Sequence, residues 1–155
     1  MGSLSRGERG LLGRAVEELL RELGDRVVAV ALFGSRARGE ADAGSDYDFL
    51  VVVRGLRGLG RRFRIYDPLR RVLKTDVTVL DVDESKVFRE DLTIDPLLLN
   101  IAWDAVVLYD PTGRLDRLFK RIRMAVKEAG LIRYRTKDGK YGWKPAKGGL
   151  KTIEV

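Results

Sequence analysis

Short runs of consecutive apolar residues alternate along the chain with longer segments in which an apolar residue recurs every three or four positions. Continuous runs of this length are typical of buried strands, whereas the three- and four-residue spacing is typical of helices with one buried face. The alternation predicts an α/β fold. The strand-like runs cover residues 27–33, 47–53, 75–80 and 105–109.

Most of the helical segments begin or end with residues that favour helix termini. Ser5 and Glu8 form a capping-box pattern, and Gly24 follows the first helical stretch. Pro68 lies within the second stretch, where it either kinks one helix or starts a new one. The helical segments cover residues 5–23, 61–74, 83–88, 95–102 and 114–129.

The pattern changes after the last of these helices. Two segments of alternating residues flank the pair Asp138-Gly139, which favours a tight hairpin turn. We therefore assign residues 1–130 to one domain and residues 131–155 to a basic C-terminal tail that forms a β-hairpin. The hairpin interleaves basic and aromatic residues, so two roles stay open. It either stacks on nucleic-acid bases or completes the fold, exposed or exchanged within a homodimer.

The composition excludes several classes of chemistry. The chain contains neither cysteine nor histidine, which rules out disulfides, thiol nucleophiles and catalysis by Ser-His or Cys-His pairs. Carboxylates, lysine, arginine, tyrosine and bound metal ions remain as catalytic groups. No apolar stretch is long enough to span a membrane and no signal peptide precedes the first helix, so we expect a soluble, cytoplasmic protein.

The net charge of +7 is unevenly distributed. Residues 54–75 and 114–155 are strongly basic, and residues 76–113 between them are strongly acidic. Such blocks can steer an anionic substrate, a nucleic acid or an acidic partner. The high charged fraction, 34%, agrees equally with the ion-pair surface of a protein from a thermophile.

Two aspartates at the start of the second apolar run are the clearest candidates for chemistry. Asp46 and Asp48 lie two residues apart in a predicted strand, so both carboxylates face the same side, where a divalent cation would offset their charge. Such a pair also occurs as a solvated loop end. Here, however, a Gly34-Ser35 bend, suited to binding phosphate oxygens, precedes the pair and Asp76 opens the next strand. Together these residues suggest metal-assisted phosphoryl or nucleotidyl transfer.

This arrangement resembles the DNA polymerase beta-type nucleotidyltransferase superfamily, and the small size of the chain resembles its minimal nucleotidyltransferases (MNT). The resemblance covers residues 11–111 and includes the Arg-x-Arg-Gly connection after the bend. It implies a nucleotidyltransferase fold, in which helices flank a small mixed β-sheet. In this chain a C-terminal helix and the basic hairpin would follow.

The resemblance also implies roles for individual residues. Asp46, Asp48 and Asp76 would be the catalytic residues and the ligands of Mg²⁺ or Mn²⁺. Asp76 would also help to remove the proton of the acceptor hydroxyl. The bend would hold the β- and γ-phosphates. Arg36 or Arg38 would neutralise the leaving pyrophosphate, unless both pair with Glu40 or Asp42 instead. The candidate nucleotide-binding residues are Gly34, Ser35, Arg36, Arg38 and Ser45.

The implied reaction is transfer of a nucleoside monophosphate, with AMP preferred, from a nucleoside triphosphate such as ATP to an acceptor hydroxyl. In relatives of this size the acceptor is often a tyrosine of a small helical HEPN-type toxin, which the transferase neutralises as an antitoxin. Two alternatives from other classes stay open. The chain is either a binding module that neutralises a partner without turnover, or a nucleic-acid-binding protein that uses its basic tail.

Overall fold

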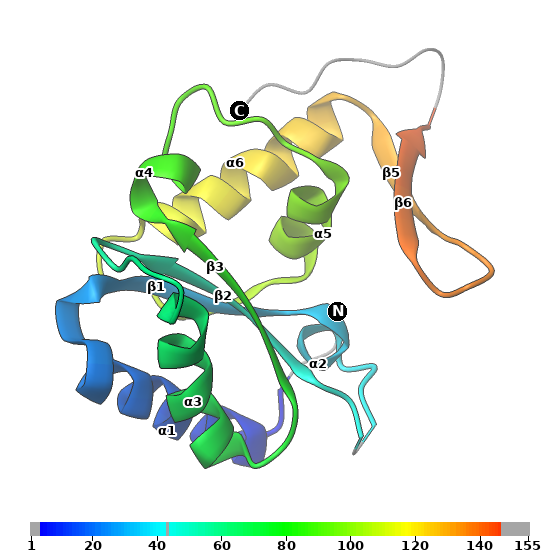
Figure 1. Ribbon diagram of the computed structural model, residues 1–155. Coiled ribbons are helices and arrows are strands. Elements are labelled where there is room, and N and C mark those ends of the chain that lie inside the picture. The colour runs from blue at the N-terminus through cyan, green and yellow to red at the C-terminus, as the bar shows by residue number, and fades with distance from the viewer. Residues whose placement is uncertain (1–3, 43, 147–155) are drawn as a thin grey trace.

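The computed structural model describes residues 4–42 and 44–146, and its main element is a four-stranded sheet (Figure 1). The strand order is β3-β2-β1-β4. The strands are β1 (Val27–Phe33), β2 (Tyr47–Val53), β3 (Val77–Asp83) and β4 (Val106–Tyr109). β2 pairs parallel with β3 and antiparallel with β1, and β1 pairs antiparallel with β4. The sheet is therefore mixed, as expected for the nucleotidyltransferase fold.

Helices cover both faces of this sheet. α1 (Arg6–Leu23) and α3 (Arg61–Leu73) pack on one face, and α5 (Pro96–Asp104) and α6 (Arg114–Glu128) pack on the other (Figure 1). Successive residues of β2 point to opposite faces and are nearly all buried, which explains the unbroken apolar run of this central strand.

The predicted helix boundaries are largely confirmed. Ser5 and Glu8 form the capping box of α1, and Asp83 caps the short helix α4 (Glu84–Val87). Pro68 lies inside a single continuous helix, α3, so no second helix starts there. Among the described residues, no helix has the length and apolarity that crossing a membrane would require.

Two segments differ from the sequence prediction. Residues 34–38 form a short helix, α2 (Gly34–Arg38), which ends at Gly39 in a left-handed conformation. β3 begins at Val77 and continues to Asp83, so Asp76 precedes the strand and the predicted end at residue 80 was too early. Asp81 hid this extension because it interrupts the apolar pattern while its carboxylate pairs with two arginines of α3.

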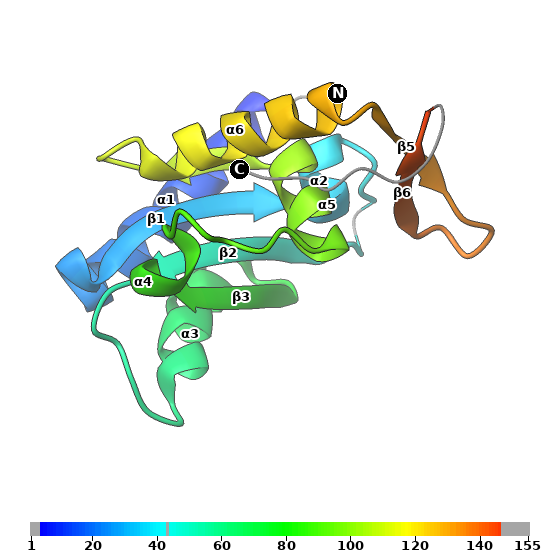
Figure 2. The same ribbon diagram turned by 90° about the horizontal axis from the view of Figure 1, so that it is seen from above.

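The C-terminal hairpin is confirmed, and it docks on α5. β5 (Leu131–Arg135) and β6 (Tyr141–Pro145) form a separate two-stranded sheet beyond the α5 end of the main sheet (Figure 2). The Trp143 indole donates a hydrogen bond to Asn100 of α5, with 3.0 Å between nitrogen and oxygen. Residues 147–155, for which the sequence leaves an edge strand or disorder open, lie outside the described residues.

Candidate active site

The Gly34-Ser35 bend lies directly against Asp48. The last residue of β1, Phe33, pairs with Asp48 of β2, so Gly34 follows immediately beside this carboxylate. Gly34 has a φ of 76°, which side chains disfavour, and an added Cβ would lie 2.1 Å from Asp48 Oδ2. Only glycine fits here, because any larger residue would displace either the bend or the carboxylate.

Asp48 is half-buried beside a second carboxylate. Burial raises its pKa, the Thr78 hydroxyl lowers it, and the negative charge of Asp46 raises it again. The ionised form of Asp48 is therefore less favourable than in water, and a bound cation would stabilise it. Oxygen ligands on adjacent carboxylates fit Mg²⁺ or Mn²⁺, so the residues present are compatible with the metal that the fold family implies.

Asp76 lies at the same end of the sheet as Asp46 and Asp48, directly before β3. Tyr47 and Val77 are the first paired residues of β2 and β3, so Asp46 and Asp76 each come one residue earlier. The Tyr47 amide donates a hydrogen bond of 3.1 Å to the Asp76 carbonyl. Residues 4–42 and 44–146 contain no group of three or more Asp, Glu, His or Cys side chains placed to hold a metal ion, so this backbone pairing does not by itself make a three-carboxylate site. The role of Asp76 stays a prediction.

Arg36 stabilises the loop before β2. Its Nε and Nη2 donate hydrogen bonds to the Ser45 carbonyl at 3.2 and 2.9 Å, and its guanidinium stacks on Tyr47 at 4.3 Å. The Ser45 hydroxyl accepts a hydrogen bond of 3.1 Å from the Asp42 amide. Arg36 and Ser45 thus hold the connection that delivers Asp46, and their predicted contact with nucleotide stays untested.

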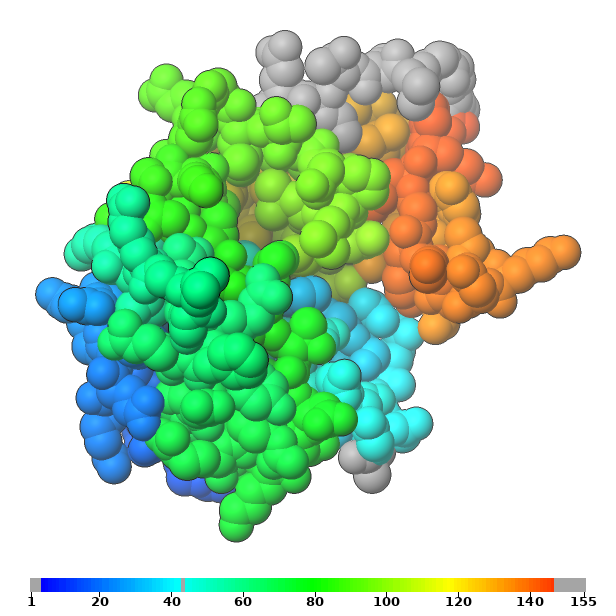
Figure 3. All heavy atoms as spheres, in the orientation of Figure 1, coloured from blue at the N-terminus to red at the C-terminus, as the bar shows by residue number. Residues whose placement is uncertain are grey.

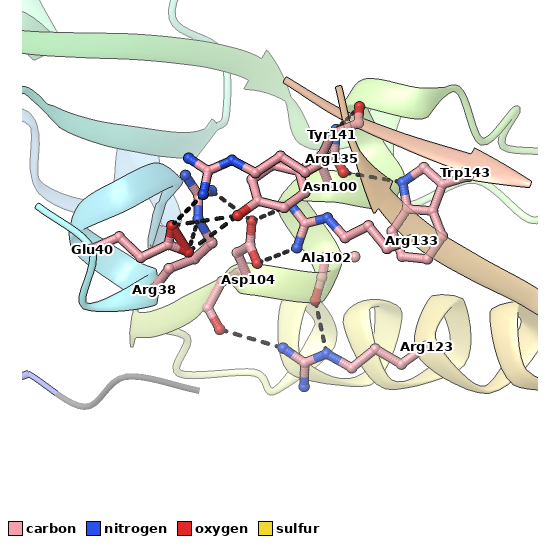
Figure 4. Close-up of polar contacts among 11 residues, drawn as sticks. Arg38, Glu40, Asn100, Ala102, Asp104, Arg123, Arg133, Arg135, Tyr141 and Trp143 are labelled. Carbon is pink, nitrogen blue, oxygen red and sulfur yellow. Dashed lines mark hydrogen bonds and ion pairs between the residues drawn. The ribbon is translucent and has the colours of Figure 1, made fainter. Parts of the chain in front are cut away.

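Arg38 is held by two carboxylates next to the bend. Its Nε lies 3.2 Å from Glu40 Oε1, and its Nη1 lies 3.0 Å from Asp104 Oδ2 (Figure 4). Its positive charge also favours the ionised form of Asp48, although burial outweighs this effect on the pKa. Glu40 was a predicted alternative partner of the arginines, whereas Asp104 had no predicted role. The only feature of the sequence that could have drawn attention to Asp104 is its place as an acidic residue at the end of an otherwise apolar helix.

A hollow of about 300 Å³ lies on the face of the sheet that carries Asp48. Leu50, which follows Asp48 by two residues on the same face of β2, is one of its lining residues, and the hollow is visible between α4 and α5 (Figure 3). Its walls are mostly apolar, so it offers space for an apolar part of a ligand. The apolar lining residues are Leu50, Leu80, Val82, Val87, Leu92, Leu97, Leu98 and Ile101.

Two comparisons with solved structures match this fold. One is a toxin–antitoxin complex with AMP-PNP, with a TM-score of 0.53, 18% identity, and coverage of 75% of this chain and 87% of that chain. The other is a mutant of a toxin–antitoxin complex, MntA-HpeT, with a TM-score of 0.52, 16% identity and the same coverage, 75% and 87%. At these identities the likeness concerns the fold.

Sequence comparison identifies the family. A protein of Methanocaldococcus jannaschii, whose name proposes protein adenylyltransferase activity, is 28% identical over 122 residues, which are 76% of this chain and 82% of that protein. The family described as "Polymerase beta, Nucleotidyltransferase" matches residues 15–100, more than half of the chain and all of the segment from the middle of α1 to the middle of α5. This chain therefore belongs to the polymerase beta-type nucleotidyltransferase family and is a nucleotidyltransferase.

Proposed function

We propose that this nucleotidyltransferase transfers AMP from ATP to a hydroxyl group on a partner protein. The observation that carries the proposal is the close approach of Gly34 to Asp48, because it joins a glycine bend suited to phosphate to a half-buried carboxylate that a cation would stabilise. Both features are needed at one place when a metal-bound triphosphate reacts.

In this reaction the acceptor oxygen forms a bond to the α-phosphorus of ATP. The bond from that phosphorus to the bridging oxygen breaks, and pyrophosphate leaves. Asp46 and Asp48 would hold the divalent ions, which supply charge neutralisation when bound, and Asp76 is the predicted third ligand and proton acceptor. Backbone amides of the bend at Gly34 and Ser35 would orient the β- and γ-phosphates.

A protein acceptor is supported by what the similar proteins are. The M. jannaschii relative bears a name that proposes protein adenylylation, and one structure with the same fold is a toxin–antitoxin complex with the ATP analogue AMP-PNP. We therefore expect a small helical HEPN-type partner, with a tyrosine hydroxyl as the acceptor. The apolar hollow on the same face of the sheet as Asp48 would contact the nucleoside or the tyrosine ring.

The test is a transfer assay with ATP labelled at the α-phosphate. The protein is mixed with Mg²⁺ and with each small helical protein that a neighbouring gene is found to encode, and label on the partner is followed by electrophoresis. We expect label from ATP in preference to GTP, CTP or UTP, and none with Asp48→Asn. Neutralisation of the partner by a variant with asparagine at positions 46, 48 and 76 would contradict the proposal and favour a binding module without turnover.

A further inference from the structure

We propose that Asp104 is a positioning residue for nucleotidyl transfer: it holds Arg38 at the active site, and Arg133 of the C-terminal hairpin holds Asp104 in turn. The inference deepens the proposed function and rests on it. It makes the hairpin a working part of the active site, although the hairpin lies outside the segment that matches the family, residues 15–100.

Asp104 is the only buried charged residue in the described part of the chain, with 5% of its surface exposed. Both of its oxygens bind Arg133, at 2.7 Å from Nη1 to Oδ1 and 2.7 Å from Nη2 to Oδ2. Oδ2 also accepts the hydrogen bond of 3.0 Å from Arg38 (Figure 4). A buried carboxylate with these bidentate and single bonds fixes both arginines in direction as well as in distance.

The hairpin also contacts the second carboxylate that binds Arg38. The Tyr141 hydroxyl donates a hydrogen bond of 3.1 Å to Glu40, and the Arg133 guanidinium lies 3.8 Å from the centre of the Tyr141 ring (Figure 4). Two residues of one hairpin thus hold the two acidic partners of Arg38. Arg38 and Asp104 are 66 residues apart in sequence, and Glu40 and Tyr141 are 101 residues apart, so neither pair is brought together by local structure.

Arg38 retains a donor that can reach a substrate. Its Nε and Nη1 are engaged by Glu40 and Asp104, whereas its Nη2 makes no hydrogen bond within residues 4–42 and 44–146. Arg38 ends α2, which begins at Gly34 against Asp48, so its side chain is one helical turn from the bend. An arginine held on two sides, with one amino group available, is suited to a phosphate oxygen of the triphosphate.

The experiment changes the hairpin and measures nucleotide binding. Arg133→Gln should raise KM and Kd for ATP about tenfold, as expected for loss of one charge-assisted contact, and should change kcat less. Arg133→Lys, which keeps the charge but not the bidentate geometry, should recover part of the affinity. The matched control is Arg123→Gln. Arg123 binds the Ala102 carbonyl of α5, the helix that also carries Asp104, but it contacts neither Asp104 nor Glu40, so this variant should leave KM unchanged.

A double-mutant cycle separates positioning from a loss of folding. If Arg133 acts through Arg38, adding Arg133→Gln to Arg38→Gln should raise Kd for ATP no further, because the two effects share one contact. Multiplicative effects, or a lower melting temperature with an unchanged Kd, would overturn the inference. Calorimetric Kd values also keep the two proposals apart: ATP binding that depends on Arg133 without any transfer to protein would refute the proposed function alone.

Discussion

Two aspartates in this molecule, Asp48 and Asp104, occupy opposite electrostatic environments. Asp104 is buried and accepts three hydrogen bonds from two arginines. Asp48 is half-buried beside another carboxylate, and its pKa is raised by burial. Asp104 is neutralised by two arginines of the protein itself, whereas the charge of Asp48 is opposed by burial and by Asp46, so a bound cation would stabilise it. Under the two proposals, the difference distinguishes a carboxylate that positions Arg38 from one that would bind the metal and nucleotide.

The largest expected effect is on activity when Asp48 is changed. Asp48→Asn should lower AMP transfer by about a thousandfold or more, roughly 4 kcal/mol in the transition state, because a metal ligand is lost. Its thermal stability should stay the same or rise, since the repulsion with Asp46 disappears. Initial rates with labelled ATP and a melting curve give both quantities. A stable variant with full activity would remove Asp48 from the mechanism.

Asp104→Asn, unlike Asp48→Asn, should clearly lower the stability of the fold. Replacing the carboxylate leaves the largely buried Arg133 without its counter-charge and Arg38 with Glu40 alone, and we expect a loss of about 3 kcal/mol in the free energy of unfolding. Urea denaturation measures this loss, with Asp48→Asn as the comparison. If the two variants were equally stable, the contrast between the two aspartates would be wrong.

Gly34→Ala tests the close approach of the bend to Asp48. The added Cβ meets Oδ2 and the positive φ disfavours alanine, so we expect a loss of about 1–3 kcal/mol in stability together with lower transfer activity. Gly13→Ala is the control, because Gly13 lies in α1 with no neighbour within 4 Å of its Cβ position. That substitution should stabilise the protein by about 0.5–1 kcal/mol. Denaturation curves that rank the two variants the other way would speak against the contact.

The smallest effect concerns pH. The pKa of Asp48 is raised on folding, so its contribution to stability is present below the unfolded pKa and is lost as the pH rises through the folded value. The pKa of Asp81 is lowered from its usual value by Arg62 and Arg61 against the effect of burial, so its contribution is lost as the pH falls instead. Each variant is compared with the wild-type protein by melting temperature between pH 3 and 7. As the pH rises, the wild type should lose stability relative to Asp48→Asn and gain stability relative to Asp81→Asn. Parallel curves would contradict the assignment.

The sequence predicted those features of the fold that depend on nearby residues. The capping box at Ser5, the tight turn at Asp138-Gly139 and the buried strands follow from short patterns, and the structure has them. The proximity of the Gly34 bend to Asp48 was also expected, because both lie at the adjoining ends of predicted strands.

The features missed from sequence depend on contacts between distant segments. Asp104 acquires its role from Arg133, 29 residues later, and from Arg38, 66 residues earlier, and no spacing rule links them. Arg36 was a candidate for phosphate, but its guanidinium binds the Ser45 carbonyl, an acceptor that every residue carries and that sequence cannot single out. Pattern therefore identified the candidate residues, whereas packing determines which groups each arginine binds.

The most direct test of the account is calorimetric titration of ATP into the protein with and without Mg²⁺. The account predicts binding by the wild-type protein only when Mg²⁺ is present, and loss of that binding in Asp48→Asn at unchanged or higher melting temperature. Equal affinity for ATP in the presence of a chelator, or in Asp48→Asn, would contradict the claim that Asp48 and the glycine bend form the nucleotide site.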